Sequence, residues 1–174
     1  TVAGIDGVEQ ATPQFFTQTV NQSCCSVIGV TRVVGIDMKT DFIVGPWLVG
    51  GTLEGGALPP DGIILGAAAP PIEGGQASIL GSVFYCVGTL EPTGSSVDET
   101  IFMDVNAART IAAESPYLES VWLNVDPFDA ISCVMVKVKE GAQPSAVAAA
   151  IIEQVPGAAA VCTSDLIAGA TSHL

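Results

Sequence analysis

The feature that most constrains the fold is a change in the spacing of apolar residues near the end of the chain. Val134, Val136 and Val138 alternate with Lys137 and Lys139. Side chains two positions apart share one face of a strand, so this spacing predicts a strand with one buried face. Beyond it the apolar residues recur at every fourth position, which is the spacing of one helix face.

The predicted helix has signals for its start and its end. Pro144 suits the first turn, and Val147, Ile151 and Val155 form the stripe that would be buried. The Pro-Gly pair that follows ends the helix. We expect a second strand over residues 158–163, which completes a β-α-β unit.

The start of the chain predicts a β-hairpin. Residues 7–20 are expected to form one strand, and residues 24–36, which are rich in Val and Ile, a long second strand. Between them, Asn21-Gln22-Ser23 is typical of a turn.

The centre of the chain is rich in Gly and Pro and predicts short strands joined by turns. Strand-like runs occupy residues 63–66, 77–80, 83–90 and 100–103, and the second and third are close enough to form a hairpin. Asp104 is a suitable N-cap for a helix that ends at Ser115-Pro116. The apolar face of that helix would hold Val105, Ala108, Ile111 and Ala112.

These elements predict an α+β fold. We expect a mixed sheet with helices that is built from both chain ends, includes the C-terminal β-α-β unit and carries an inserted β-rich lobe. Residues 1–36 and 114–174 would form the mixed α/β subdomain, and residues 37–113 the inserted β-rich subdomain.

The charge of the chain excludes several classes of function. The net charge is −13, and the five basic residues are scattered: Arg32, Lys39, Arg109, Lys137 and Lys139. Nucleic-acid binding needs a basic face, and five scattered basic residues do not form one. The lack of a basic face also disfavours binding to an anionic membrane surface. The longest uncharged stretches, residues 10–31 and 74–90, are too polar or too rich in Gly for a membrane-spanning helix.

The sequence predicts no catalytic site. A Ser-His-Asp or Cys-His arrangement needs an imidazole, and the single His173 lies next to the C-terminus. Paired carboxylates, such as Asp98-Glu99 and Asp126 with Asp129, lie in turn-like segments where Asp is common. A hydrolase that uses two carboxylates is nevertheless kept as an alternative. The Gly-rich run over residues 50–56 lacks a phosphate-binding motif and is expected to be a loop.

No metal or cofactor is expected either. The chain has one His and no C-x-x-C motif, which disfavours a zinc site. Clustered acidic residues such as Glu91, Asp98, Glu99 and Asp104 give a weak calcium hypothesis without the EF-hand pattern. The five cysteines are interpreted as small buried apolar residues, with disulfides left open: Cys24, Cys25, Cys86, Cys133 and Cys162. Trp47, in a loop rich in Gly and Pro, is a weak candidate for contact with a partner.

The order of segments in the centre of the chain is more specific than any one of them. They are Val34-Gly35-Ile36-Asp37, Pro46-Trp47 with Gly50-Gly51, Ile63-Ile64-Leu65-Gly66, Val83-Phe84-Tyr85-Cys86-Val87-Gly88-Thr89-Leu90, Thr93-Gly94, and Asp98-Glu99-Thr100-Ile101-Phe102-Met103. This order resembles the periplasmic core domain of MacB/FtsX-like ABC-transporter permeases, and the match spans about residues 33–113. The pair Cys24-Cys25 is not part of the family pattern.

The resemblance implies an extracytoplasmic domain between the first two transmembrane helices of a permease. Such a domain engages a partner outside the membrane and relays the motion that a separate cytoplasmic ATPase drives. The implied partners are that ATPase, reached through flanking helices, an extracytoplasmic protein, and a second permease copy in a homodimer. A free-standing extracellular module that binds a cationic or metal ligand is the alternative, and it draws on the charge of −13.

Overall fold

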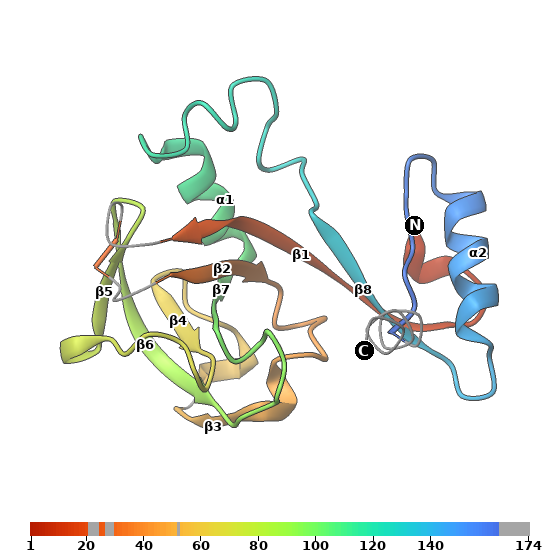
Figure 1. Ribbon diagram of the computed structural model, residues 1–174, viewed down its shortest axis with the longest axis horizontal. Helices are drawn as coiled ribbons and strands as arrows, with labels where there is room; N and C mark the ends of the chain where they lie inside the picture. The colour runs from red at the N-terminus through yellow and green to blue at the C-terminus, as the bar shows by residue number, and fades with distance from the viewer. Residues whose placement is uncertain (21–24, 27–29, 52, 164–174) are drawn as a thin grey trace, which may run out of the picture. The chain divides into compact units, whose positions relative to one another are not determined.

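The computed structural model describes residues 1–20, 25–26, 30–51 and 53–163 (Figure 1). Contacts within the chain divide it into two compact units. The smaller unit consists of Thr1–Ala11 and the chain from Val134 onward, and the larger unit is Thr12–Cys133. Strand β1 (Val8–Val20) belongs to both, because it begins in the smaller unit and ends in the larger one.

The described residues form a mixed eight-stranded sheet and two α-helices, which confirms the predicted α+β class. The strand order is β3-β6-β4-β7-β2-β1-β8, and β5 pairs with β6. The remaining strands are β2 (Thr31–Ile36), β3 (Leu48–Gly50), β4 (Gly62–Leu65), β5 (Gln76–Ile79), β6 (Ser82–Leu90), β7 (Thr100–Asp104) and β8 (Cys133–Val138). The helices are α1 (Val105–Glu114) and α2 (Pro144–Gln154). Short 3-10 turns cover Val2–Gly4, Gly45–Trp47, Glu54–Gly56 and Glu73–Gly75.

Strands β2 and β7 form the parallel centre of the larger unit. Val33 lies opposite Ile101, and Ile36 opposite Asp104. On their outer sides β2 pairs antiparallel with β1, as the predicted hairpin requires, and β7 pairs antiparallel with β4. Parallel strands are usually buried on both faces and read as continuous apolar runs. The run of Val and Ile in β2 is of this kind.

Helix α1 covers one face of this sheet. Asp104 caps the helix as predicted, since its Oδ1 accepts hydrogen bonds from the backbone N–H groups of Asn106, at 2.8 Å, and Ala107, at 3.2 Å. The buried face of α1 holds the four predicted residues. They pack in one cluster with Phe15, Val33, Ile63, Ile101 and Met103 of the sheet. Gly35 permits this packing, because a Cβ atom there would lie 2.7 Å from the Cβ of Ala108.

The opposite face of the sheet is covered by the segment between β2 and β4. Val44 and Leu58 from this segment are buried against Val34, Ile64 and Phe102. The Gly- and Pro-rich stretch therefore forms part of the core, and it closes the second face of the parallel pair.

The β5–β6 hairpin is confirmed and turns through Leu80 and Gly81. Both have positive φ, 52° and 94°, as the favoured two-residue hairpin turns require. Positive φ is unusual for a Leu. Tertiary contacts hold it there: the Leu80 side chain is buried, its N–H donates to Cys25 Sγ at 3.3 Å, and its carbonyl accepts from Ser115 Oγ at 2.7 Å.

A tight turn precedes β7 at the Thr-Gly…Asp segment. Asp98 Oδ1 accepts hydrogen bonds from the backbone N–H and the hydroxyl of Thr93, both at 2.8 Å. Its Oδ2 accepts one from the Gly94 N–H at 2.8 Å. These donors stabilise the ionised carboxylate, so the pKa of Asp98 lies below its ordinary value.

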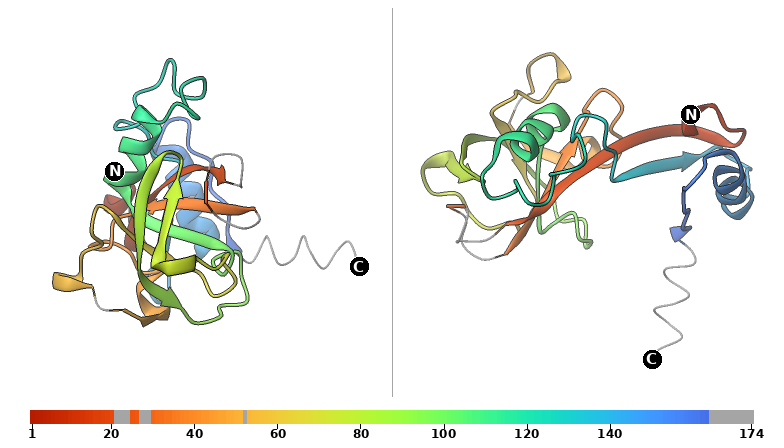
Figure 2. Two further views of the ribbon diagram at one scale, coloured as in Figure 1. Left: turned by 90° about the vertical axis from the view of Figure 1, so that its left-hand side faces the viewer. Right: turned by 90° about the horizontal axis from the view of Figure 1, so that it is seen from above.

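In the smaller unit, α2 packs on β8 and on the start of β1 (Figure 2). Val147 and Ile151 of α2 are buried with Ile5 and Val8, and the predicted stripe is confirmed. Val136 and Val138 of β8 join this cluster, whereas Lys137 faces outward. Lys137 Nζ lies 2.7 Å from Glu9 Oε1, and this exposed pair contributes little to stability.

Two predicted strands differ from the structure. Residues 158–162 contain no strand, so the C-terminal unit has the first strand and the helix of the predicted β-α-β. Ala158 and Ala160 pack against the α2 cluster, but Ala has little preference for strands. The predicted strand over residues 24–36 was too long: β2 begins at Thr31, and Cys25-Ser26 forms a bend.

Some predictions are not tested by the structure. The turn at residues 21–23, Cys24 and His173 lie outside the described residues. The boundaries between the two compact units lie at residues 11/12 and 133/134. The predicted division into subdomains stays a prediction: residues 1–36 with 114–174 as the mixed α/β subdomain, and residues 37–113 as the inserted β-rich subdomain.

Replacing Gly35 tests the close approach of α1 to the sheet. Gly35→Ala places a methyl group against Ala108 Cβ and within 3.1 Å of Val105 Cα. We expect the free energy of unfolding to fall by about 1–3 kcal/mol, as overpacking does in other cores. Urea denaturation measures it. Gly45→Ala is the control, since its Cβ would meet its nearest neighbour at 3.8 Å. Equal stability of the two variants would contradict this packing.

Replacing Asp98 tests the turn before β7. Because the pKa of the folded state is lowered, the carboxylate stabilises the fold above the pKa of the unfolded chain, and this stabilisation is lost as pH falls through the folded pKa. Asp98→Asn should therefore lower Tm at neutral pH, and the difference from wild type should shrink as pH falls below about 4, the ordinary pKa of an Asp side chain. Thermal unfolding followed by circular dichroism between pH 3 and pH 7 tests this. Asp61→Asn removes the same charge and should show a smaller difference, and a pH-independent difference at position 98 would contradict the account.

Candidate functional site

Trp47, the predicted partner contact, lies on a fixed backbone in the larger unit. Asp41 Oδ2 accepts hydrogen bonds from the N–H groups of Val44, at 2.8 Å, and Gly45, at 3.0 Å, just before it. The Trp47 carbonyl accepts one from the Glu91 N–H at 2.8 Å, which ties it to the end of β6. The indole is 40% exposed. A half-exposed aromatic side chain on a rigid turn suits a contact with another molecule, and its role stays a prediction.

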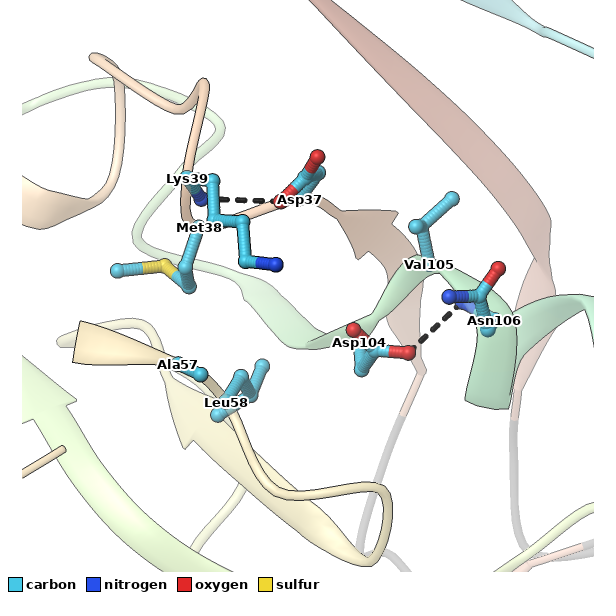
Figure 3. Close-up of a pocket in the computed structure, with 8 residues that line it drawn as sticks. All are labelled: Asp37, Met38, Lys39, Ala57, Leu58, Asp104, Val105 and Asn106. Atoms are coloured by element: carbon cyan, nitrogen blue, oxygen red, sulfur yellow. Dashed lines mark hydrogen bonds between the residues drawn. The ribbon is translucent and has the colours of Figure 1, made fainter. Parts of the chain in front are cut away.

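A cavity of about 220 Å³ opens where the parallel strands β2 and β7 end (Figure 3). Asp37 directly follows β2, and Asp104 ends β7. The register that places Ile36 opposite Asp104 brings these two carboxylates to the same edge. The other lining residues are Met38, Lys39, Ala57, Leu58, Val105 and Asn106. The carboxyl edge of parallel strands is where open α/β sheets commonly bind ligands.

Both carboxylates of this cavity already have structural partners. Asp37 Oδ1 accepts a hydrogen bond from the Lys39 N–H at 2.9 Å, and Asp104 Oδ1 caps α1 (Figure 3). The cavity is also smaller than the roughly 300–1,000 Å³ of typical small-molecule sites. We therefore assign it no ligand.

The predicted acidic pairs are likewise used in local turns. Asp98 holds the turn before β7, and Asp126 Oδ1 accepts a hydrogen bond from the Phe128 N–H at 2.9 Å. Within the described part of the chain no cluster of three or more His, Cys, Asp or Glu side chains is arranged to hold a metal ion. The arrangement of the described carboxylates gives the calcium hypothesis no support.

The cysteines have different surroundings. Cys25 is buried and accepts the Leu80 N–H, whereas Cys86, Cys133 and Cys162 are free thiols that are partly exposed. Cys133 Sγ donates to Gln14 Oε1 at 3.7 Å, and burial raises the pKa of this thiol. A raised pKa disfavours the reactive thiolate form. Of the described cysteines, only Cys25 fits the predicted role of a fully buried apolar residue.

One surface was missed by the sequence reasoning. The segment between α1 and β8, residues 115–132, exposes six large apolar side chains to solvent. Their spacing follows neither the period of a strand nor that of a helix. A signal was available in the high density of apolar residues in a stretch that also contains Pro, Asn and Asp, which is unusual for a solvated loop.

Comparison with known proteins shows likeness in fold. No protein-family profile matches this sequence, and neither does any curated protein sequence. Among solved structures, the extracellular domain of the noncanonical ABC-type transporter YknZ from Gram-positive bacteria is 14% identical and has a TM-score of 0.48. The alignment covers 84% of this chain and 74% of that domain.

A second solved structure is a domain of a Porphyromonas gingivalis protein that is assigned as a permease. It is 19% identical, with a TM-score of 0.50 over 86% of this chain. This chain spans 64% of the length of that domain. None of the helices that the structure describes has the length and apolar character needed to cross a bilayer. The fold of this chain is similar to that of the Porphyromonas gingivalis domain, which agrees with the resemblance in its segment order.

Proposed function

We propose that this chain is the extracytoplasmic domain of an ABC-transporter permease. It would engage a partner or substrate outside the membrane and couple that contact to the ATP-driven motion of transmembrane helices. The observation that carries the proposal is the fold shared with the permease domain, in a chain whose central segments follow the order of that family. ATP hydrolysis would take place on a separate subunit, so the domain itself needs no catalytic site.

The distribution of the chain between its two units supports a coupling role. Thr1–Ala11 and the described part of Val134–Leu174 belong to the same compact unit. A domain inserted between two membrane helices needs this arrangement, because both flanking helices then act on one folded body. Strand β1 continues from that unit into the larger one without interruption. The two units are joined at residues 11/12 and 133/134, so a displacement at the chain ends would have to pass through these two connections.

Contact with an outside partner would fall on the larger unit in this proposal. Trp47 remains a candidate contact there, since its indole is half exposed on a backbone that is hydrogen-bonded on both sides. The negative charge of the chain favours a partner with basic surface groups. A homodimer of the full-length permease, bound to its ATPase, is part of the same proposal.

The gene that encodes this chain tests the proposal directly. It should encode an apolar span of about 20 residues on each side of the domain. The full-length product, purified in detergent, should bring down an ABC ATPase that is identified by mass spectrometry. Replacement of the domain by a short flexible linker should leave the ATPase bound but abolish its response to the outside partner. Polar flanking sequences, or purification without an ATPase, would contradict the proposal.

A further inference from the structure

The segment between α1 and β8 forms a long loop (Figure 1). It contains turns and bends but no helix or strand. Six large apolar side chains point outward within 15 residues and are each 48–69% exposed: Tyr117, Val121, Leu123, Val125, Phe128 and Ile131. We call this set the apolar loop surface. Scattered single apolar residues are normal on a protein, whereas such a concentration marks an interaction site.

The loop is held in one conformation by contacts on its inner side. Leu118 is completely buried, and the ring of Trp122 packs on Phe15 with 5.2 Å between ring centroids. Arg109 of α1 donates from its guanidinium to the Ala130 carbonyl at 3.0 Å. The inward residues alternate irregularly with the outward ones. A surface whose backbone is already fixed loses little conformational entropy on binding, which favours affinity.

The same loop carries exposed acidic side chains, which we call the acidic rim. Glu119, Asp126 and Asp129 are exposed between the apolar side chains, and residues 115–132 contain no Lys or Arg. Charges at the edge of an interface select partners of opposite sign and speed their association. The best complement is therefore an apolar surface with basic groups around it.

We propose that the apolar loop surface is the docking site for a basic amphipathic segment of a partner protein. The apolar side of that segment would cover Leu123, Phe128 and their neighbours, and its Lys or Arg side chains would pair with the acidic rim. Large apolar and aromatic side chains supply most of the binding energy at such interfaces. Trp122 and Leu118 serve as internal supports beneath the surface.

The same charges argue against two other occupants. A second copy of this chain would bring its own acidic rim close to the first, and like charges across an interface cost binding energy. An anionic membrane would repel the rim for the same reason. Occupation of the surface by either one would overturn the proposal.

The inference rests on the proposed function only for the identity of the partner in the cell. The apolar surface and its acidic rim belong to the chain whether or not it is part of a transporter. A binding experiment with the purified chain therefore fails or succeeds independently of the flanking helices and the ATPase.

The test uses an amphipathic helical peptide made of leucine and lysine, and a matched peptide with glutamate in place of lysine. Isothermal titration calorimetry should show saturable one-to-one binding of the lysine peptide, weakened by salt, and no binding of the glutamate peptide. The double variant Leu123→Ser/Phe128→Ser should bind at least about tenfold more weakly. Its Tm should stay near that of wild type, because both side chains are exposed.

The control is Val83→Ser/Tyr85→Ser, which removes two side chains of similar exposure from strand β6. It should bind the lysine peptide like wild type. If the loop variant does not fold, Asp126→Lys/Asp129→Lys reverses the rim charge and should weaken binding by a similar factor. Equal binding of both peptides, or of the loop and control variants, overturns the proposal. The proposal is also overturned by a dimer that only the loop variant abolishes, or by binding to vesicles of anionic phosphatidylglycerol that only the loop variant abolishes.

Discussion

Strands β2 and β7 run in parallel at the centre of the larger unit, although 68 positions separate Arg32 from its partner Thr100. This pairing brings strands from the first and the middle part of the chain into one sheet, and helix α1 packs on it. A parallel pair needs cover on both faces. Helix α1 covers one face, where Gly35 lets it approach the backbone of β2, and the segment between β2 and β4 covers the other. The cavity, the Trp47 turn and the anchored loop all lie on elements that this arrangement positions.

The sequence predicted elements whose signals are local. Asp104 and the buried face of α1 were predicted residue by residue, because a cap and a helical stripe depend on neighbours within one or two turns. The same holds for the stripe of α2 and for the β5–β6 hairpin. Long-range pairing was not accessible in this way. The length of β2 and the absence of a strand at residues 158–162 are set by which partners a segment finds, and propensity alone does not specify them.

The same distinction between local signals and long-range contacts applies to the candidate sites. Trp47 was a weak candidate because of its loop, and the structure places it half exposed on a rigid turn. The cavity at the ends of β2 and β7 depends on the register between strands that are far apart in the sequence. The sequence around Asp37 and Asp104 therefore does not show that they lie at the same edge of the sheet. The apolar loop surface depends on Leu118 and Trp122 facing inward, which turns the remaining apolar side chains outward. The sequence of an irregular loop has no periodicity that would show which side chains face inward and which face outward.

The proposed function places this fold outside the cytoplasm, as part of a permease. Gly74 and Gly75 lie in an exposed turn with open space around them, so a protease cleavage site inserted between them should leave the core intact. The measurement is cleavage of the full-length protein by added protease in intact spheroplasts of its host. An extracytoplasmic domain would be cleaved before lysis. Cleavage that occurs only after the cells are lysed would contradict it.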